Sequence, residues 1–168
     1  LGTAAHCAVL EPERFRQLYV SWDRRSEETG NLCPRRGKYW NEFQAMHAGN
    51  FIITEDEYAN ALAMQQAIRA DATAMKYLQS GEPEVTMTWV TTLERPEGTR
   101  SVECRGRPDW VTTMLGRVPH LIGLKTARDV RPLIFGNAAA RLGYPMSWAF
   151  YADGYEAITG IRPISKEI

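Results

Sequence analysis

The spacing of the apolar residues changes at Glu84, halfway along a chain of 168 residues. Before this point apolar side chains recur at the spacing of amphipathic helices, whereas after it they alternate with polar ones, as in a half-buried strand. A Pro- and Gly-containing turn at 95–98 predicts a hairpin. The predicted strands cover 84–90, 102–111 and 120–126, and a long helix covers 132–153. This order predicts an α/β fold with a mixed central sheet flanked by helices.

The first half of the chain carries two helix-start signals. Thr54 and Glu57 have the capping-box spacing, with a hydroxyl at the N-cap and a carboxylate three residues later. Asp71 is expected to cap a short helix that ends at Leu78. Upstream, we expect helices over 1–10 and 39–48, a strand over 15–22 and a polar loop over 23–38.

The length suits one domain with its own hydrophobic core, so 1–168 is interpreted as a single domain. The chain begins at Leu1 without a methionine and ends soon after a predicted strand start, which is consistent with truncation at both ends. It has 20 basic and 20 acidic residues. The net charge is therefore zero and gives no indication of nucleic-acid binding, although a local basic patch can still bind DNA.

The three cysteines are far apart and odd in number, which predicts neither a disulfide framework nor a zinc site. A reducing cytoplasm is therefore the expected setting. No apolar run approaches the roughly 18 residues that span a bilayer, so we expect no membrane partner.

An aspartate and a lysine occupy unusual places among the predicted strands. Asp109 follows Pro108, which cannot donate to a sheet ladder, and Lys125 follows the apolar run 121–124. Taken singly, such an aspartate is more often a turn cap, and a lysine at a strand end is often solvated. Taken together they are more informative. A lysine on an apolar strand needs an anion, and either Asp109 or a phosphate would supply one.

This pair of residues suits phosphodiester hydrolysis. A divalent metal neutralises the phosphate and activates a water in that reaction, and Mg²⁺ prefers carboxylate oxygens as ligands. A nearby lysine stabilises the charge that develops in the transition state.

Several motifs, in the same order, resemble those of the PD-(D/E)xK nuclease superfamily. Within it they are most similar to the exonuclease VIII (RecE-type) C-terminal domain of phages and prophages. The central match is G-R-P-D at 106–109 followed by L-K-T at 124–126. The flanking matches are G-T-A-A-H at 2–6, L-E-P at 10–12, R-G-K at 36–38 and Y-P-M-S-W-A-F-Y at 144–151.

The resemblance implies a nuclease core that digests double-stranded DNA ends with Mg²⁺, or Mn²⁺, in phage-type recombination. It implies His6, Asp109 and the backbone carbonyl of Leu124 as metal ligands, Lys125 beside the attacked phosphate, and Glu84 as a supporting carboxylate. The implied partners are double-stranded DNA, a single-strand annealing protein and further copies of the chain in a homo-oligomer. The implied setting is the cytoplasm of a bacterial host cell.

Six side chains are candidates for DNA contact: Arg107, Tyr144, Ser147, Tyr151, Arg36 and Lys38. The two tyrosines share one face of a predicted helix. Arg36 and Lys38 belong to a basic loop. Two glutamates lie within this loop, so it could equally be a solvated loop without a ligand.

Two positions depart from the family pattern: Gly123 stands where the second acidic ligand is expected, and Ser147 where a glutamine is expected. Three interpretations follow. In the first, Glu84, Glu103 or Asp129 supplies the missing carboxylate. In the second, the protein binds DNA without cutting it, and in the third, the glycine is an engineered change. The second reading describes a catalytically impaired DNA-binding or assembly subunit. An endonuclease with the same fold is a further alternative.

Overall fold

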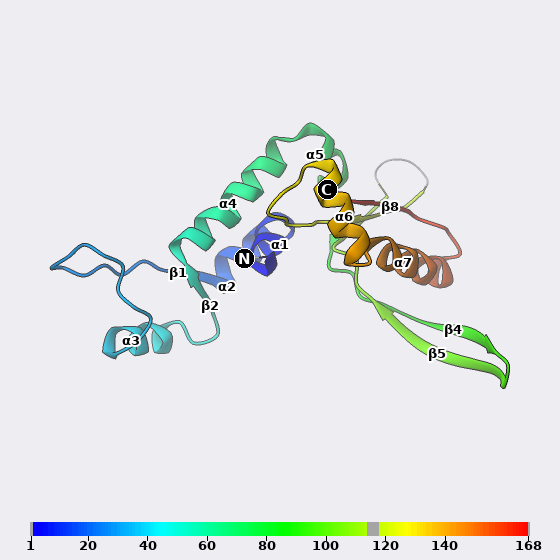
Figure 1. Ribbon diagram of the computed structural model, residues 1–168, viewed down its shortest axis with the longest axis horizontal. Helices are drawn as coiled ribbons and strands as arrows, with labels where there is room; N and C mark the ends of the chain where they lie inside the picture. The colour runs from blue at the N-terminus through cyan, green and yellow to red at the C-terminus, as the bar shows by residue number, and fades with distance from the viewer. Residues whose placement is uncertain (1, 114–117, 168) are drawn as a thin grey trace. The chain divides into compact units, whose positions relative to one another are not determined.

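The computed structural model describes residues 2–113 and 118–167, and Leu1 of the predicted first helix lies outside them (Figure 1). The chain divides into two compact units, residues 1–70 and 71–168, which are described separately. Among the described residues, no helix is both long enough and apolar enough to cross a membrane.

The first unit is built on three helices, α1 (Gly2–Leu10), α2 (Pro12–Leu18) and α4 (Glu55–Ala70). Helix α1 contacts both of the others. Small residues on α1 and α4 allow this close approach, and aromatic rings from α2 and the strand after it fill the remaining space. The buried cluster consists of Ala4, Ala8, Phe15, Tyr19 and Ala61.

The strand predicted over 15–22 is wrong in its first half, because α2 continues to Leu18 and β1 covers only Tyr19–Trp22. Phe15, Leu18 and Tyr19 satisfy helical spacing as well as they satisfy alternation, and Pro12 at the first helical turn favours the helix. Strand β1 pairs in parallel with β2 (Phe51–Thr54), a short strand that was not predicted from the sequence. The loop over 23–38 and the helix after it, α3 (Lys38–Met46), lie where predicted.

The second unit contains a four-stranded sheet in the order β3-β6-β7-β8. Its strands are β3 (Glu82–Pro83), β6 (Trp110–Thr112), β7 (His120–Gly123) and β8 (Ile164–Glu167). The first two pairings are antiparallel, and β7 pairs with β8 in parallel. The prediction of an α/β fold with a mixed sheet is therefore confirmed.

A separate hairpin joins β4 (Met87–Arg95) to β5 (Gly98–Gly106) through the predicted turn. Met87 and Trp89 are buried while Thr88 and Val90 are exposed, as the alternation predicted. The strand begins at Met87 rather than Glu84, however. The strand predicted over 102–111 is interrupted between Gly106 and Trp110, where Pro108 has no N–H to donate. The third predicted strand ends at Gly123, before Lys125.

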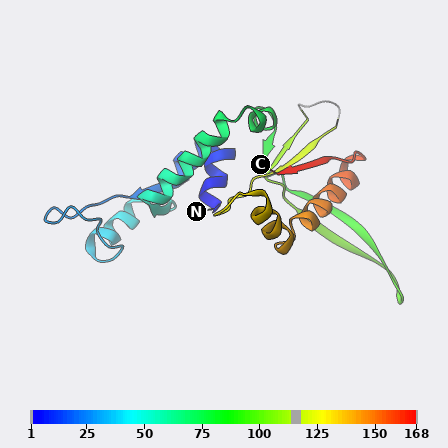
Figure 2. The same cartoon turned by 45° about the horizontal axis from the view of Figure 1, so that its top comes forward.

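The long helix predicted over 132–153 is two helices, α6 (Pro132–Arg141) and α7 (Tyr144–Thr159). Gly143 separates them with a φ of 72°, a left-handed conformation that glycine adopts at little cost. Helix α7 contacts the hairpin strands β4 and β5 and also β8 (Figure 2). A short helix, α5 (Ala72–Leu78), precedes the sheet and contacts β6. Its N-cap is Asp71, as predicted, since the carboxylate accepts from the N–H groups of Thr73 and Ala74.

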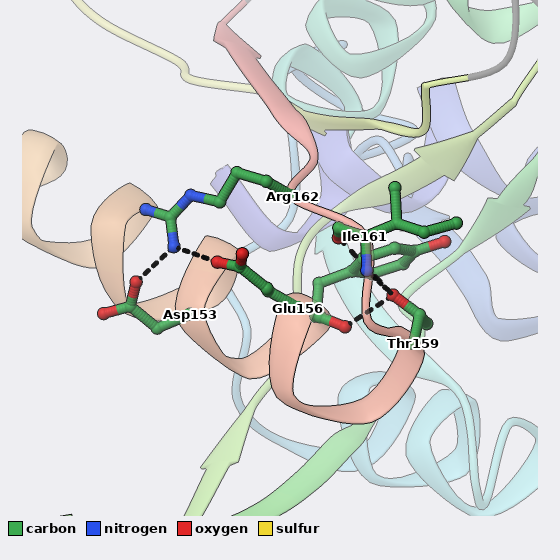
Figure 3. A network of polar contacts seen from close by, with 6 residues as sticks. Asp153, Glu156, Thr159, Ile161 and Arg162 are labelled. Atoms are coloured by element: carbon green, nitrogen blue, oxygen red, sulfur yellow. Dashed lines mark hydrogen bonds and ion pairs between the residues drawn. The ribbon is translucent and has the colours of Figure 1, made fainter.

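Polar contacts hold the exit of α7 in place (Figure 3). The Arg162 guanidinium donates to Asp153 at 2.5 Å and to Glu156 at 2.9 Å, and both carboxylates lie on the last turns of the helix. These carboxylates raise the pKa of Arg162. The Thr159 hydroxyl accepts from the Ile161 N–H at 3.2 Å. The chain is thereby directed from α7 toward β8.

Candidate active site

Asp109 lies in the interruption between β5 and β6, where the chain is free of ladder pairing. Its carboxylate oxygen Oδ2 accepts the backbone N–H of Leu124 at 2.8 Å and faces the Lys125 ammonium at 3.2 Å. The Asp109 and Lys125 side chains are only 17% and 24% exposed. An ion pair so far withdrawn from water is screened less by solvent and salt than a surface pair. The two residues singled out in the sequence therefore meet directly.

Leu124 meets Asp109 through its N–H group. That contact orients the carboxylate from the end of β7, and it places the first residue after the strand beside the acidic side chain. The role predicted for the Leu124 carbonyl, as a metal ligand, stays a prediction.

Glu84 follows β3 and lies beside Asp109. Its N–H donates to the Asp109 carbonyl at 3.0 Å, and carboxylate oxygens of the two residues lie within 4.8 Å of each other. Arg107 balances the charge of Glu84 with an Nε–Oε2 distance of 2.9 Å. The backbone φ of Glu84 is 53°, a value that costs a residue with a side chain of order 1–2 kcal/mol. Strain of this kind is typical of functional positions.

Glu84 is thus the one of the three substitute carboxylates that the structure brings to Asp109. Glu103 is exposed on β5, opposite Val90. Asp129 is engaged with Arg131, whose side-chain and backbone hydrogen bonds lower the pKa of that carboxyl. Among the described residues, neither joins a group of side chains spaced for a metal ion.

The donors at this position suit a hard divalent cation. Two carboxylates within 4.8 Å of each other concentrate negative charge, and oxygen ligands are what Mg²⁺ and Mn²⁺ prefer. Lys125 and Arg107 neutralise that charge in the structure described here. Both cations come from flexible side chains, so they can turn toward a phosphate instead.

A groove of about 470 Å³ runs between the end of β5 and α7. Three of the predicted DNA-contacting residues, Arg107, Ser147 and Tyr151, line it. Its other side chains, which were not predicted from the sequence, are those of Arg105, Met146 and Phe150. Arg105 had a usable signal, since it precedes Arg107 by two residues and both positions are exposed. Phe150 lies within the Y-P-M-S-W-A-F-Y segment but was not singled out.

Four predicted site residues remain. The Tyr144 ring centroid is 5.5 Å from the Lys125 ammonium nitrogen, so this tyrosine belongs to the lysine's surroundings. His6 lies on α1, and Arg36 and Lys38 lie in the loop and helix α3, all in the first unit. Lys38 is paired with Glu42 at 3.8 Å. Roles for these three stay predictions.

The mixed α/β fold is that of a PD-(D/E)xK-like protein, a class that includes metal-dependent nucleases. Comparison with protein families agrees, since residues 1–166 match a PDDEXK-like domain of unknown function (DUF3799). The chain belongs to this family, and the match extends over both compact units. None of the curated proteins matches the chain.

Proposed function

We propose that this protein is a metal-dependent exonuclease that hydrolyses phosphodiester bonds at double-stranded DNA ends. The observation that carries the proposal is the Asp109–Lys125 ion pair with the Glu84 carboxylate beside it. Membership of a PDDEXK-like family supports the nuclease chemistry. The preference for DNA ends rests on the motif resemblance to the exonuclease VIII type alone.

In this proposal Asp109 and Glu84 hold the divalent cation, Mg²⁺ or Mn²⁺, with the Leu124 carbonyl as a further ligand. When bound, such an ion neutralises the phosphate and lowers the pKa of a coordinated water. Lys125 exchanges its contact with Asp109 for the attacked phosphate and stabilises the charge that develops there. Arg107 makes the same exchange from Glu84 to a neighbouring phosphate.

The groove beside α7 is the proposed path of the DNA. Arg105 and Arg107 offer cations for phosphates, and Tyr151 and Phe150 offer ring faces for bases or sugars. Ser147 would donate a hydroxyl to the same backbone. Arg36, Lys38 and Tyr144 are proposed as further contacts, and His6 as a further metal ligand, on the sequence motifs alone.

The second candidate function is a DNA-binding or assembly subunit that does not cut. The observation in its favour is Gly123, which offers no side-chain oxygen at the position of the second acidic ligand. The cytoplasm of a bacterial host, a single-strand annealing partner and a homo-oligomer are proposed for either function, from the resemblance and from the cysteine pattern.

Digestion of end-labelled linear duplex DNA with Mg²⁺ tests the proposal. We expect release of labelled nucleotides by the wild type, and a loss of about 100-fold or more in Lys125→Ala, Asp109→Asn and Glu84→Gln. Glu103→Gln is the matched control, because this carboxylate is exposed on β5 and should leave the rate unchanged.

Each outcome separates the candidates. A wild type that binds the duplex but releases nothing would establish the non-catalytic subunit. Activity that survives Lys125→Ala would place the chemistry elsewhere in the chain. Covalently closed circular duplex tests for an endonuclease of the same fold. An exonuclease leaves this substrate intact, whereas an endonuclease nicks it.

A further inference from the structure

Gly123 is a glycine for a reason other than its backbone. It is buried at the end of β7, in register with β8, and its φ lies outside the left-handed region that favours glycine. Any residue could adopt this extended conformation. The absence of a side chain must therefore be explained by what surrounds the Cα atom.

The indole of Trp148 occupies that space. A Cβ atom built on Gly123 would lie 2.6 Å from the Trp148 ring carbon Cη2 and still closer to Cζ2. Real Cβ contacts essentially never fall below 3.0 Å. Trp148 comes from α7, so the helix can lie at its present position only if residue 123 is a glycine or the ring moves.

The same indole also faces Lys125. The ammonium nitrogen lies 5.8 Å from the Trp148 ring centroid and 5.5 Å from that of Tyr144. Both values are within the roughly 6 Å at which a cation is attracted to an aromatic face. Lys125 thus contacts Asp109 and two rings from α7.

We infer that Trp148 is the positioning residue for Lys125, and that its indole replaces in space the acidic side chain absent at Gly123. An indole at 148 and a carboxylate at 123 then exclude one another. The site relies on Glu84 and Asp109 for its carboxylates and on a ring, rather than a second neighbouring acid, to orient the lysine. The steric part of this inference is independent of the proposed function, and the positioning part rests on it.

A double-mutant cycle tests the steric part. We expect Gly123→Asp alone to lower the urea midpoint of unfolding clearly, and Trp148→Ala to lower it by removing ring contacts. In the double variant the added carboxylate fits the vacated space, so the two losses should be far from additive. Gly136→Asp is the matched control, because nothing lies within 4 Å of a Cβ atom at that glycine. Additive losses in the double variant would overturn the exclusion.

Two conservative variants test the positioning part. Trp148→Phe keeps an aromatic face, while Trp148→Leu keeps apolar bulk without one. We expect the ring-current shift of the Lys125 ε-methylene protons to persist in the phenylalanine variant and to diminish in the leucine variant. We also expect kcat to fall about tenfold in Trp148→Leu with KM little changed, and to be largely retained in Trp148→Phe.

Equal behaviour of the two variants, in the proton shift and in kcat, would overturn the positioning role. The proton shift and the unfolding cycle need no catalytic activity. If the wild type proves inactive, these two measurements still decide whether Trp148 holds the lysine and excludes a carboxylate, so the two proposals fail separately.

Discussion

At the scale of single residues, Glu84 has a strained backbone conformation that places its carboxylate beside that of Asp109. Among the described residues it is the only one other than glycine with a positive φ, at 53°. That backbone turns its N–H toward the Asp109 carbonyl and brings the two carboxylates together. A glycine would adopt the same backbone without strain but would bring no carboxylate.

We therefore predict that Glu84→Gly is more stable than Glu84→Ala by about 1 kcal/mol, because both lose the carboxylate and only alanine keeps the strain. Urea unfolding of the two variants measures the difference. The control is the same pair of substitutions at Thr88, an exposed position on β4, where the order should reverse because glycine weakens a strand. An alanine variant as stable as the glycine variant at position 84 would show that Glu84 is not strained.

The residue scale also shows how far the sequence could predict the site. The Asp109–Lys125 pair was predictable, because a lysine at the end of an apolar strand demands an anion and a nearby aspartate supplied it. Glu84 was one of three candidate carboxylates, and on a regular strand Glu103 would also face the same side as Asp109. The break at Pro108 removed that regularity. Trp148 was not predictable, because its contact with Gly123 depends on how a distant helix packs against the sheet.

At the scale of elements, α4 depends on the capping box that begins it. The Thr54 hydroxyl accepts the Glu57 N–H at 3.1 Å, and the Glu57 carboxylate accepts the Thr54 N–H at 2.9 Å. The second contact is the main cause that lowers the pKa of Glu57 below its ordinary value of 4.5. Helix α4 in turn supports α1, so the cap stabilises the core of the first unit.

We predict that Thr54→Ala lowers the free energy of unfolding by about 1 kcal/mol at neutral pH. Because the pKa of Glu57 is depressed in the folded state, the contribution of its carboxylate is complete above the unfolded value near 4.5 and is lost as the pH falls through the folded value. Unfolding midpoints of the wild type and Glu57→Gln should therefore converge in acid. Asp56→Asn, at an exposed neighbouring position, is the control. A difference that persists unchanged at low pH would contradict the role of the carboxylate.

Element boundaries were predicted where a local signal set them. The capping box, the Asp71 cap and the hairpin turn all lie where the sequence indicated, because each is decided by a few adjacent residues. The predicted long helix was wrong at Gly143, and the predicted first strand was wrong up to Leu18. At Gly143 the apolar spacing fits one long helix as well as two shorter ones, and before Leu18 it fits a strand as well as a helix. Packing within the unit decides between the alternatives in both places.

At the scale of the whole molecule, charge balance constrains how DNA would be bound under the proposed function. With 20 basic and 20 acidic residues the protein has no net field to attract a polyanion, so affinity must come from a few local cations. In the second unit the proposed cations are Arg105 and Arg107, which line the groove, and Lys125, which pairs with Asp109. Few phosphate contacts imply that binding weakens only gradually as salt is added, since each contact contributes a slope of about −0.9 in log K against log salt.

We predict that Arg105→Ala weakens duplex binding and reduces the magnitude of that slope by about one, which is the loss of a single phosphate contact. Arg100→Ala is the matched control, because Arg100 is exposed on the same strand but does not line the groove. Titrations of labelled duplex in EDTA, at several salt concentrations, measure binding without cleavage. Equal losses in the two variants would mean that the groove is not the DNA path. A slope unchanged by Arg105→Ala, with weaker binding, would mean that this arginine shapes the groove without contacting a phosphate.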